Sequence, residues 1–193
     1  MAVSRCAWAE SGDPAMVAYH DREWGVPHHD DTALFELLTL EGAQAGLSWR
    51  TILARRDAYR EAYHGFDIAR VAAMRDPSLE KLLTASSIIR NRLKVISVRD
   101  NARVALGVIE EHGSLDAYLW SFVGGQPVLN RRRESGQVPA KTDLSDRMSK
   151  TMVKRGFRFV GSTICYAFMQ ATGMVNDHLV SCFRYEESGH AEH

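Results

Sequence analysis

Cysteine and histidine residues near both ends of the chain are the feature that most restricts its fold. His178 and Cys182 lie four residues apart in the segment MVNDHLVSC, and one turn of helix would place both side chains on one face. A structural zinc ion takes four Cys or His ligands in a tetrahedron, and the N-terminal segment offers Cys6 and His20. Such a site would fasten together two terminal segments that otherwise tend to fray.

Two alternatives remain open for these residues. The cysteines and histidines can be unrelated buried side chains, and other histidines compete as ligands, although none of these is paired with a cysteine: His28, His29, His64 and His112. The third cysteine, Cys165, is expected to be a small buried hydrophobic residue. Three cysteines are an odd number, which fits a reducing compartment better than a disulfide framework. With four protein ligands no position is left for water, so a metal bound there would be structural.

The spacing of apolar residues is helical along nearly the whole chain, which predicts an all-α fold. Helix start signals support this pattern, because Asp, Ser and Asp-Pro sequences favour the first turn of a helix. We expect helices over 32–46 after Asp30, from Ser48, from Asp76, over 89–111, from Ser114, over 144–156 and over 162–173.

The stretch 124–143 breaks every helical period and is expected to be a long surface loop, because it is rich in glycine and proline. No paired strands are expected. We predict one helical unit over 1–186, made of two closely packed lobes with a pocket between them. Residues 187–193 are expected to be a disordered tail.

The charge balance restricts the partners of the protein. With 24 basic and 24 acidic residues the formal net charge is zero, which argues against wholesale coating of nucleic acid and allows only a local basic patch. The N-terminus lacks the apolar region of a secretory signal, and no segment approaches the ~20 apolar residues of a membrane helix. We therefore expect a cytoplasmic protein that does not contact a membrane.

Glu41 is the most unusual residue of the expected helix over 32–46. It follows Leu34, Leu37 and Leu38 by seven, four and three residues, so it projects from the apolar stripe of that helix. Burial of a lone carboxylate is costly unless it is paired, which makes Glu41 a candidate functional residue. The alternative is a glutamate at the edge of the stripe that is capped or held in a salt bridge.

Aromatic residues gather around the same region of the sequence. Trp49 begins the next expected helix, and Trp8, Tyr19 and Trp24 come from the segment that holds the candidate metal ligands. An acid beside several aromatic faces could sandwich a planar heterocycle and hydrogen-bond its polar edge. The alternative is an aromatic mini-core beneath the N-terminal segment.

The segment KRGFRFVGSTICYAFMQ (154–170) predicts two helices joined by a tight turn, in which Phe159 and Val160 point inward. Backbone N–H groups at the start of the second helix, with a glycine that allows close approach, form a site suited to one phosphate. The alternative is an ordinary helical hairpin with a solvated basic face. The basic residues near this turn or on the same predicted surface are Lys150, Lys154, Arg155, Arg158, Arg90, Arg92, Lys94 and 131–133.

The sequence resembles the bacterial 3-methyladenine DNA glycosylase I family across essentially its whole length. The resemblance is carried by RCAW, YHDREWGVP, LEGAQAGLSW, IIRNRLK, RGFRFVGSTICYAFMQATG and VNDHLVSC, in this order. It implies a helix-hairpin-helix fold, removal of 3-methyladenine from double-stranded alkylated DNA, one structural zinc ion and a monomer.

The resemblance also implies roles for particular residues. Zinc would be held by Cys6, His20, His178 and Cys182. Related superfamilies carry a catalytic aspartate or lysine soon after their hairpin, but the position of Asp177 beside His178 favours a role in supporting that ligand. Glu41 would be the catalytic residue, in a base pocket lined by Tyr19, Trp49, Trp8 and Trp24. The turn between the helices would hold a DNA phosphate through Gly156, Phe159, Gly161 and Thr163.

The expected chemistry is mild. A base alkylated at N3 is cationic in the nucleotide, so its glycosidic bond is weakened and no strong general acid is needed. The enzyme would flip the nucleotide, stack it on Trp49 and accept hydrogen bonds from its exocyclic amine at Glu41, without a lyase step. Two rival hypotheses are a non-catalytic module that binds damaged DNA and a hydrolase whose zinc has three protein ligands and a water.

Overall fold

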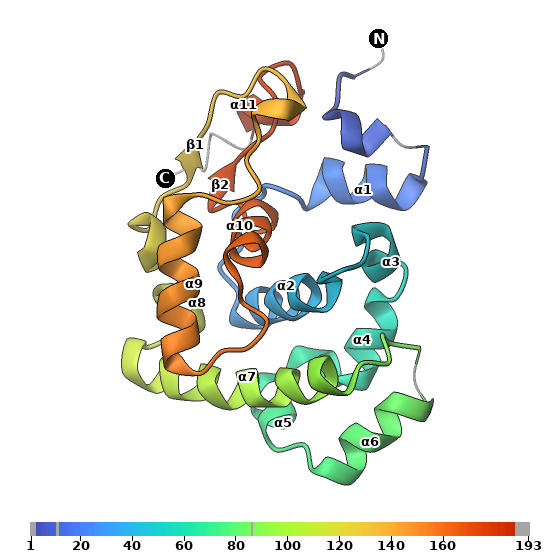
Figure 1. Cartoon of the computed structure of the whole chain (residues 1–193). Coiled ribbons are helices and arrows are strands. Elements are labelled where there is room, and N and C mark those ends of the chain that lie inside the picture. The colour runs from blue at the N-terminus through green and yellow to red at the C-terminus, as the bar shows by residue number, and fades with distance from the viewer. Residues whose placement is uncertain (1–2, 11, 86, 188–193) are drawn as a thin grey trace.

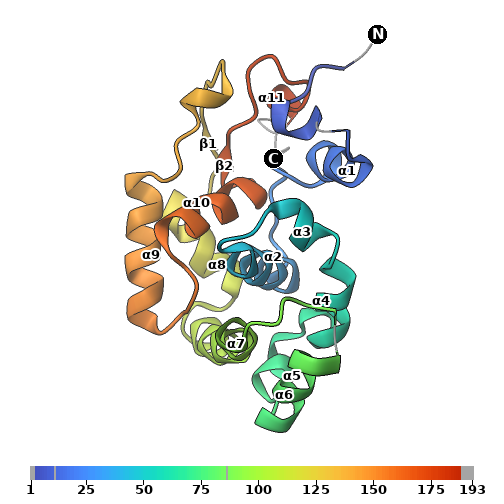
Figure 2. The same ribbon diagram turned by 45° about the vertical axis from the view of Figure 1, so that its right-hand side comes forward.

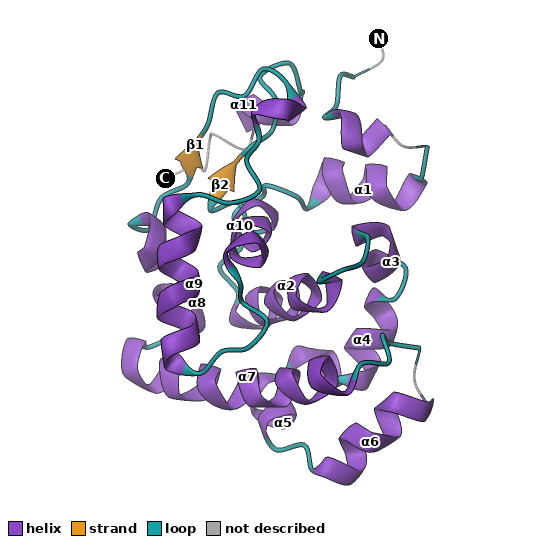
Figure 3. Cartoon of the chain, viewed as in Figure 1, coloured by secondary structure: helices purple, strands orange, loops and turns teal. Residues whose placement is uncertain are grey.

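The computed structural model of the chain describes residues 3–10, 12–85 and 87–187, and most of them are helical (Figures 1 and 3). The α-helices are α1 (Pro14–Arg22), α2 (Asp31–Gln44), α3 (Trp49–Leu53), α4 (Arg56–Ala62), α5 (Ile68–Ala72), α6 (Asp76–Ala85), α7 (Arg92–His112), α8 (Leu115–Trp120), α9 (Asp143–Arg155), α10 (Ser162–Ala171) and α11 (Arg184–Glu187). Short 3-10 helices occur at Ala7–Glu10, His64–Phe66, Ser121–Val123 and Ser135–Gln137. The predicted helical class is confirmed.

One small sheet was not expected. Strand β1 (Val128–Leu129) pairs in parallel with β2 (Val175–Asn176), with Val128 opposite Val175. Strand β1 and a 3-10 helix both lie within 124–143, so the prediction that this stretch is entirely loop was wrong. The pairing places the 124–143 segment beside the chain that follows α10.

Local capping explains where several helices begin. The side chain of Asp30 accepts a hydrogen bond from the backbone N–H of Ala33 at 2.8 Å, and Ser48 and Ser114 cap α3 and α8 in the same way. The long helix expected from residue 89 instead begins at Arg92, because Asn91 is its cap. The positions of polar capping residues therefore predict where these helices begin more accurately than the spacing of apolar residues does.

Helix α2 lies at the centre of the molecule, with α7 on one side and α10 on the other (Figure 2). Every residue from Leu34 to Ala43 is buried, so α2 has no solvent-facing side over that length. The sequence predicted one apolar face for this helix, whereas in the structure all of its faces are buried over this length. Any polar side chain on it must either find a partner inside the protein or face a cavity.

The N-terminal segment packs against the end of α10. The backbone N–H of Gly25 donates to the carbonyl of Gln170 at 3.1 Å, and that of His28 donates to Thr172. Gly173 makes this contact possible, because a Cβ there would lie 2.5 Å from the backbone nitrogen of Pro27. The backbone N–H of Phe183 also donates to the carbonyl of Ser4, so the segment before α1 meets the segment before α11.

Three expectations concern the extent of the fold. Among the described residues, no helix is both long enough and apolar enough to cross a membrane. The division of 1–186 into two lobes stays a prediction. The predicted disordered tail, 187–193, lies outside the described residues apart from Glu187, the last residue of α11.

Candidate functional site

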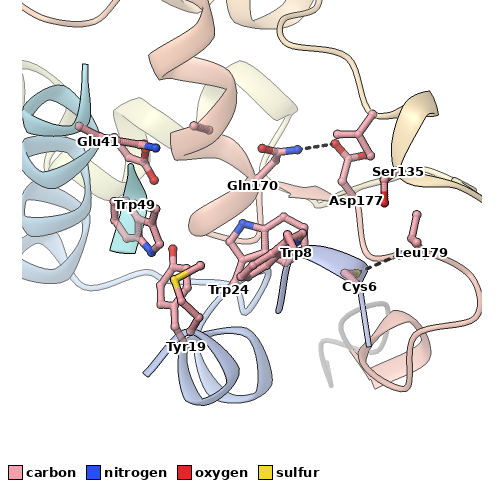
Figure 4. Close-up of a pocket in the computed structure, with 14 residues that line it drawn as sticks. Cys6, Trp8, Tyr19, Trp24, Glu41, Trp49, Ser135, Gln170, Asp177 and Leu179 are labelled. Carbon is pink, nitrogen blue, oxygen red and sulfur yellow. Dashed lines mark hydrogen bonds between the residues drawn. The ribbon is translucent and has the colours of Figure 1, made fainter. Parts of the chain in front are cut away.

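A cavity of about 360 Å³ opens between the N-terminal segment, α2, α3 and α10 (Figure 4). The residues predicted for the pocket all lie in its wall, namely Trp8, Tyr19, Trp24, Glu41 and Trp49. The prediction missed Gln44 and Gln170, which also line it. Gln170 carried a signal, since it is the one side-chain amide in the helix STICYAFMQA.

Aromatic rings form two contacting pairs in this wall. The ring centroids of Tyr19 and Trp49 lie 5.1 Å apart with a tilt of 42° between the planes, and those of Trp8 and Trp24 lie 5.1 Å apart, edge to face. Trp24 also meets the ring of His178 edge to face at 4.6 Å. The rings therefore connect the cavity wall to the candidate metal ligands. The same aromatic side chains line the predicted pocket and pack on one another as the alternative, an aromatic mini-core, required.

Glu41 faces the cavity from α2 and is 4% exposed. Among the described residues it has no hydrogen-bond or ion-pair partner, so burial alone raises the pKa of its carboxyl to about 8. The salt-bridged alternative applies instead to Glu36 on the same helix, which accepts from Arg60 at 3.0 Å and also from Arg56. At neutral pH the carboxyl of Glu41 is therefore mostly protonated.

The four predicted metal ligands come together in one buried cluster. The Sγ atom of Cys182 lies 3.5 Å from Nε2 of His20 and 3.6 Å from Nδ1 of His178, and Sγ of Cys6 lies 3.7 Å from the same Nδ1. All four ligand atoms lie within 4.8 Å of one another. Tetrahedral zinc with ordinary bond lengths requires S···N separations of about 3.6 Å. The cluster thus fits a tetrahedral metal ion.

The electrostatics of the cluster favour a thiolate. The hydrogen bond from the Cys6 thiol is the main reason that the pKa of Cys182 is lowered, and both imidazoles add to the effect. Metal ligation requires deprotonated cysteine, so Cys182 is already in the form that binds a metal.

Two groups behind the imidazoles orient them. Nδ1 of His20 lies 2.8 Å from Oδ1 of Asp21, and the other oxygen of this carboxylate, Oδ2, accepts a hydrogen bond from Arg5 at 2.7 Å. Nε2 of His178 lies 3.0 Å from the backbone carbonyl oxygen of Trp24. These contacts leave the other nitrogen of each ring directed into the cluster, where it could bind a metal ion.

Two expectations about this region were wrong. Asp177 does not support His178, since its partners are four other side chains, described below. The segment from His178 to Cys182 is not helical, and a turn in which the N–H of Cys182 donates to the carbonyl of Leu179 brings the two ligands together. A four-residue turn can achieve the same proximity as a helix.

Hydrogen bonds from α7 fix the turn between α9 and α10. Asn101 receives a hydrogen bond from the N–H of Arg158 at 2.8 Å and donates to its carbonyl at 3.0 Å. Phe159 adopts a left-handed backbone with φ of 55° and is only partly buried, whereas Val160 is buried as predicted. Gly156 ends α9 with φ of 102°, and Gly161 precedes α10. The remaining predicted residue, Thr163, is exposed in the first turn of α10.

Several predicted basic residues already have partners within the protein. Arg155 pairs with Glu111 at 2.8 Å, and Arg158 pairs with Asp100 at 3.3 Å. Lys94 donates to the carbonyls of Ala43 and Ala45 at the end of α2, so it caps that helix. The free basic surface around the turn is smaller than the sequence indicated.

Comparisons with known proteins match nearly the whole chain. The model of the methyladenine glycosylase family matches residues 8–185. The chain is 47% identical to DNA-3-methyladenine glycosylase 1 of Escherichia coli (strain K12), over 95% of this chain and 97% of that protein. It is 42% identical to DNA-3-methyladenine glycosylase of Haemophilus influenzae (strain ATCC 51907 / DSM 11121 / KW20 / Rd), over 93% of this chain and 96% of that one.

Solved structures agree with these matches. A crystal structure of 3-methyladenine DNA glycosylase I superposes with a TM-score of 0.89 at 49% identity and covers 93% of this chain and 98% of its own. A structure of 3-methyladenine DNA glycosylase I from Staphylococcus aureus, solved for the basis of 3-methyladenine recognition, has a TM-score of 0.91 at 34% identity. It covers 96% of this chain and 98% of its own.

Proposed function

The chain belongs to the methyladenine glycosylase family, and from that premise we propose that it hydrolyses the N-glycosidic bond of 3-methyladenine in DNA, without a lyase step. One observation carries the proposal for this chain. Glu41 is buried, has no hydrogen-bond or ion-pair partner among the described residues, and faces a cavity whose wall contains the rings of Trp8, Tyr19, Trp24 and Trp49. A site of this kind suits a planar base with a polar edge and has little to offer a sugar or a phosphate.

Recognition begins with stacking. Flipping a nucleotide out of the duplex costs a few kcal/mol. Each base–aromatic stack contributes ~1–3 kcal/mol, so contact with Trp49 and Tyr19 offsets much of that cost. Stacking alone does not separate damaged from normal adenine, because every base has an aromatic face.

Glu41 supplies the discrimination. The base alkylated at N3 is cationic while it is attached to the sugar, and in a desolvated pocket a cation strongly favours the ionised carboxyl. Binding the damaged base therefore releases a proton from Glu41 and creates a buried charge pair. Neutral adenine offers no such charge. The base then departs as a neutral molecule with the electron pair of the glycosidic bond, so no strong general acid is needed, and water adds to the sugar carbon with loss of a proton.

We propose that the metal is zinc and that its role is structural. The Cys2His2 donor set and the S···N distances of 3.5–3.7 Å support this metal. When bound, the ion would cross-link the N-terminal segment to the residues after β2. The rival hypothesis of a catalytic zinc needs one ligand position open to water, whereas four protein atoms are grouped here.

The DNA duplex would be held at the turn between α9 and α10. Backbone N–H groups at the start of α10 can receive one phosphate, and Lys150 and Lys154 on α9 have no ion-pair partner among the described residues. Asn101 holds the turn in place on α7. We infer that the protein acts as a monomer on double-stranded alkylated DNA.

Release of free bases from methylated DNA tests this function. The protein should liberate 3-methyladenine, detected by chromatography, and leave abasic sites that are cleaved only after treatment with alkali. If the protein binds abasic DNA but liberates no base at any concentration, it is the non-catalytic binding module. If strand breaks appear without alkali, the proposal that the enzyme has no lyase step is wrong.

A further inference from the structure

A buried carboxylate beside the cavity has no part in the function proposed above. Asp177 follows β2, is 2% exposed and lies in the cavity wall. Its carboxylate oxygens accept hydrogen bonds from Asn130 at 2.8 Å, Arg132 at 3.4 Å, the hydroxyl of Tyr166, and Gln170 at 2.8 Å. Two donors come from the 124–143 segment and two from α10, so Asp177 joins these elements behind the pocket.

The contact with Asp177 determines which way the Gln170 amide points. A side-chain amide can present either its oxygen or its NH2 group, and the two are easily exchanged by rotation. Both carboxylate oxygens of Asp177 accept hydrogen bonds from other side chains and offer no donor to Gln170, so the NH2 group of Gln170 faces Asp177. Figure 4 shows this bond, with the amide oxygen of Gln170 on the other side. No described residue donates to that oxygen.

The second glutamine of the wall differs in this respect. The side chain of Gln44 has no hydrogen-bond partner among the described residues, so its amide can turn either group toward a ligand. Gln44 therefore cannot discriminate a donor from an acceptor. Gln170 can, because rotation of its amide would bring its oxygen against a carboxylate.

We propose that Gln170 is a specificity-determining residue, which Asp177 holds so that the pocket accepts a base with an exocyclic amine and rejects one with a carbonyl in its place. This inference rests on the proposed function. An amine at position 6 of a purine carries two N–H groups, and Glu41 can accept only one of them in a planar arrangement. The fixed oxygen of Gln170 accepts the second. A carbonyl at that position would face this oxygen with no proton between them.

Binding of two free bases tests the proposal without requiring turnover. The probes are 3-methyladenine and 3-methylhypoxanthine, in which a carbonyl replaces the amine at position 6 and no amine is added at position 2, and the readout is quenching of the pocket tryptophans. Wild type should bind 3-methyladenine more tightly. Gln170→Met, similar in size but without an acceptor, should reduce the ratio of the two affinities about tenfold, the change expected for one lost hydrogen bond.

A second variant reverses the polarity. In Asp177→Asn the new amide can donate to Gln170 and let its NH2 group turn toward the pocket, so binding of 3-methylhypoxanthine should improve. Asn130→Ala is the matched control, because it removes a different donor to Asp177 and leaves the Gln170 contact in place. Its ratio should stay within about twofold of wild type.

The outcomes separate this inference from the proposed function. If Gln170→Met weakens both bases equally, or leaves the ratio unchanged, the specificity role is wrong and the residue is only part of the wall. If wild-type protein releases no 3-methyladenine from methylated DNA, the proposed function fails whatever the ratio shows. If Asp177→Asn does not fold, the Gln170→Met variant still tests the specificity role, since it leaves the other three donors to Asp177 in place.

Discussion

Phe159, in the turn between α9 and α10, packs directly on Gly42 of α2. A Cβ added at Gly42 would lie 3.2 Å from Cβ of Phe159 and 3.3 Å from its carbonyl oxygen. Gly42 is also the residue that follows Glu41. The turn proposed to hold a phosphate is thus in contact with α2, the helix that carries Glu41. Because the two are closely packed, a displacement of the turn would displace α2 as well.

Larger side chains at Gly42 should therefore affect both stability and activity. Gly42→Leu has no room beside Phe159 and should lower the free energy of unfolding by about 1–3 kcal/mol, as overpacking does. It should also lower base release. Gly107→Ala is the control, because a Cβ there meets nothing within 4 Å, and it should stabilise α7 by about 0.5–1 kcal/mol. Denaturant melts of both variants check this; a Gly42→Leu protein as stable as wild type contradicts it.

The pH dependence of kcat/KM should report Glu41. The free enzyme holds this carboxyl with a pKa of about 8, and only the ionised form pairs with a cationic base. The value of kcat/KM should thus rise about tenfold per pH unit below 8 and then level off. Glu41→Gln should be much less active and should lose this dependence. Equal base release by Glu41→Gln would show that the residue has another role.

The Glu41 carboxyl should also make the free energy of unfolding fall as pH rises. The unfolded state releases the Glu41 proton near the ordinary value of 4.5, whereas the folded state retains it up to about 8. Stability contributed by the neutral carboxyl is complete below 4.5 and is lost between 4.5 and 8, at no more than about 1.4 kcal/mol per pH unit. Glu41→Gln should remove this loss. Melting temperatures of both proteins from pH 5 to 8 should diverge, and parallel curves would contradict the raised pKa.

Local signals explain what the sequence predicted well. Asp30, Ser48 and Ser114 begin helices because a cap needs only the next few N–H groups, which are always near in sequence. The pairing of His178 with Cys182 was likewise predicted, although the helix inferred for it was wrong. Spacing constrains distance, and a turn and a helix meet that constraint equally.

Tertiary contacts explain what could not be predicted. Lys94 was assigned to a DNA-facing surface because nothing local shows that α7 begins beside the end of α2, whose carbonyls it caps. Asp177 was assigned to the neighbouring histidine, yet its partners come from 124–143 and α10. Adjacency in sequence indicates little about side-chain partners, since Asp177 contacts Gln170 whereas the next residue, His178, contacts the carbonyl of Trp24.

The three cysteines should differ sharply in their effect on the metal. Cys6→Ala should abolish stoichiometric zinc and lower the melting temperature, because a structural site lends its binding energy to the fold. Cys165→Ala is the matched control, since Cys165 is buried but donates to the carbonyl of Val160 and lies outside the cluster. It should retain one zinc ion per chain. Metal analysis with thermal melts decides the matter; zinc loss with unchanged stability would point to a site that is not structural.

Asp21 should set the affinity of the site without touching the metal. Its carboxylate holds Nδ1 of His20, and the guanidinium of Arg5 keeps the pKa of Asp21 at about 2, so the carboxyl stays ionised throughout the working range. Loss of such a partner typically weakens metal binding 10–100-fold. Asp21→Ala should do so, whereas Asp21→Asn, which can still accept from the imidazole, should lose less. Competition with a zinc chelator measures both. The exposed Asp57 provides a control, and an Asp21→Ala protein that binds zinc as tightly as Asp57→Ala would show that the ring is oriented by packing against Trp8 and Trp24 instead.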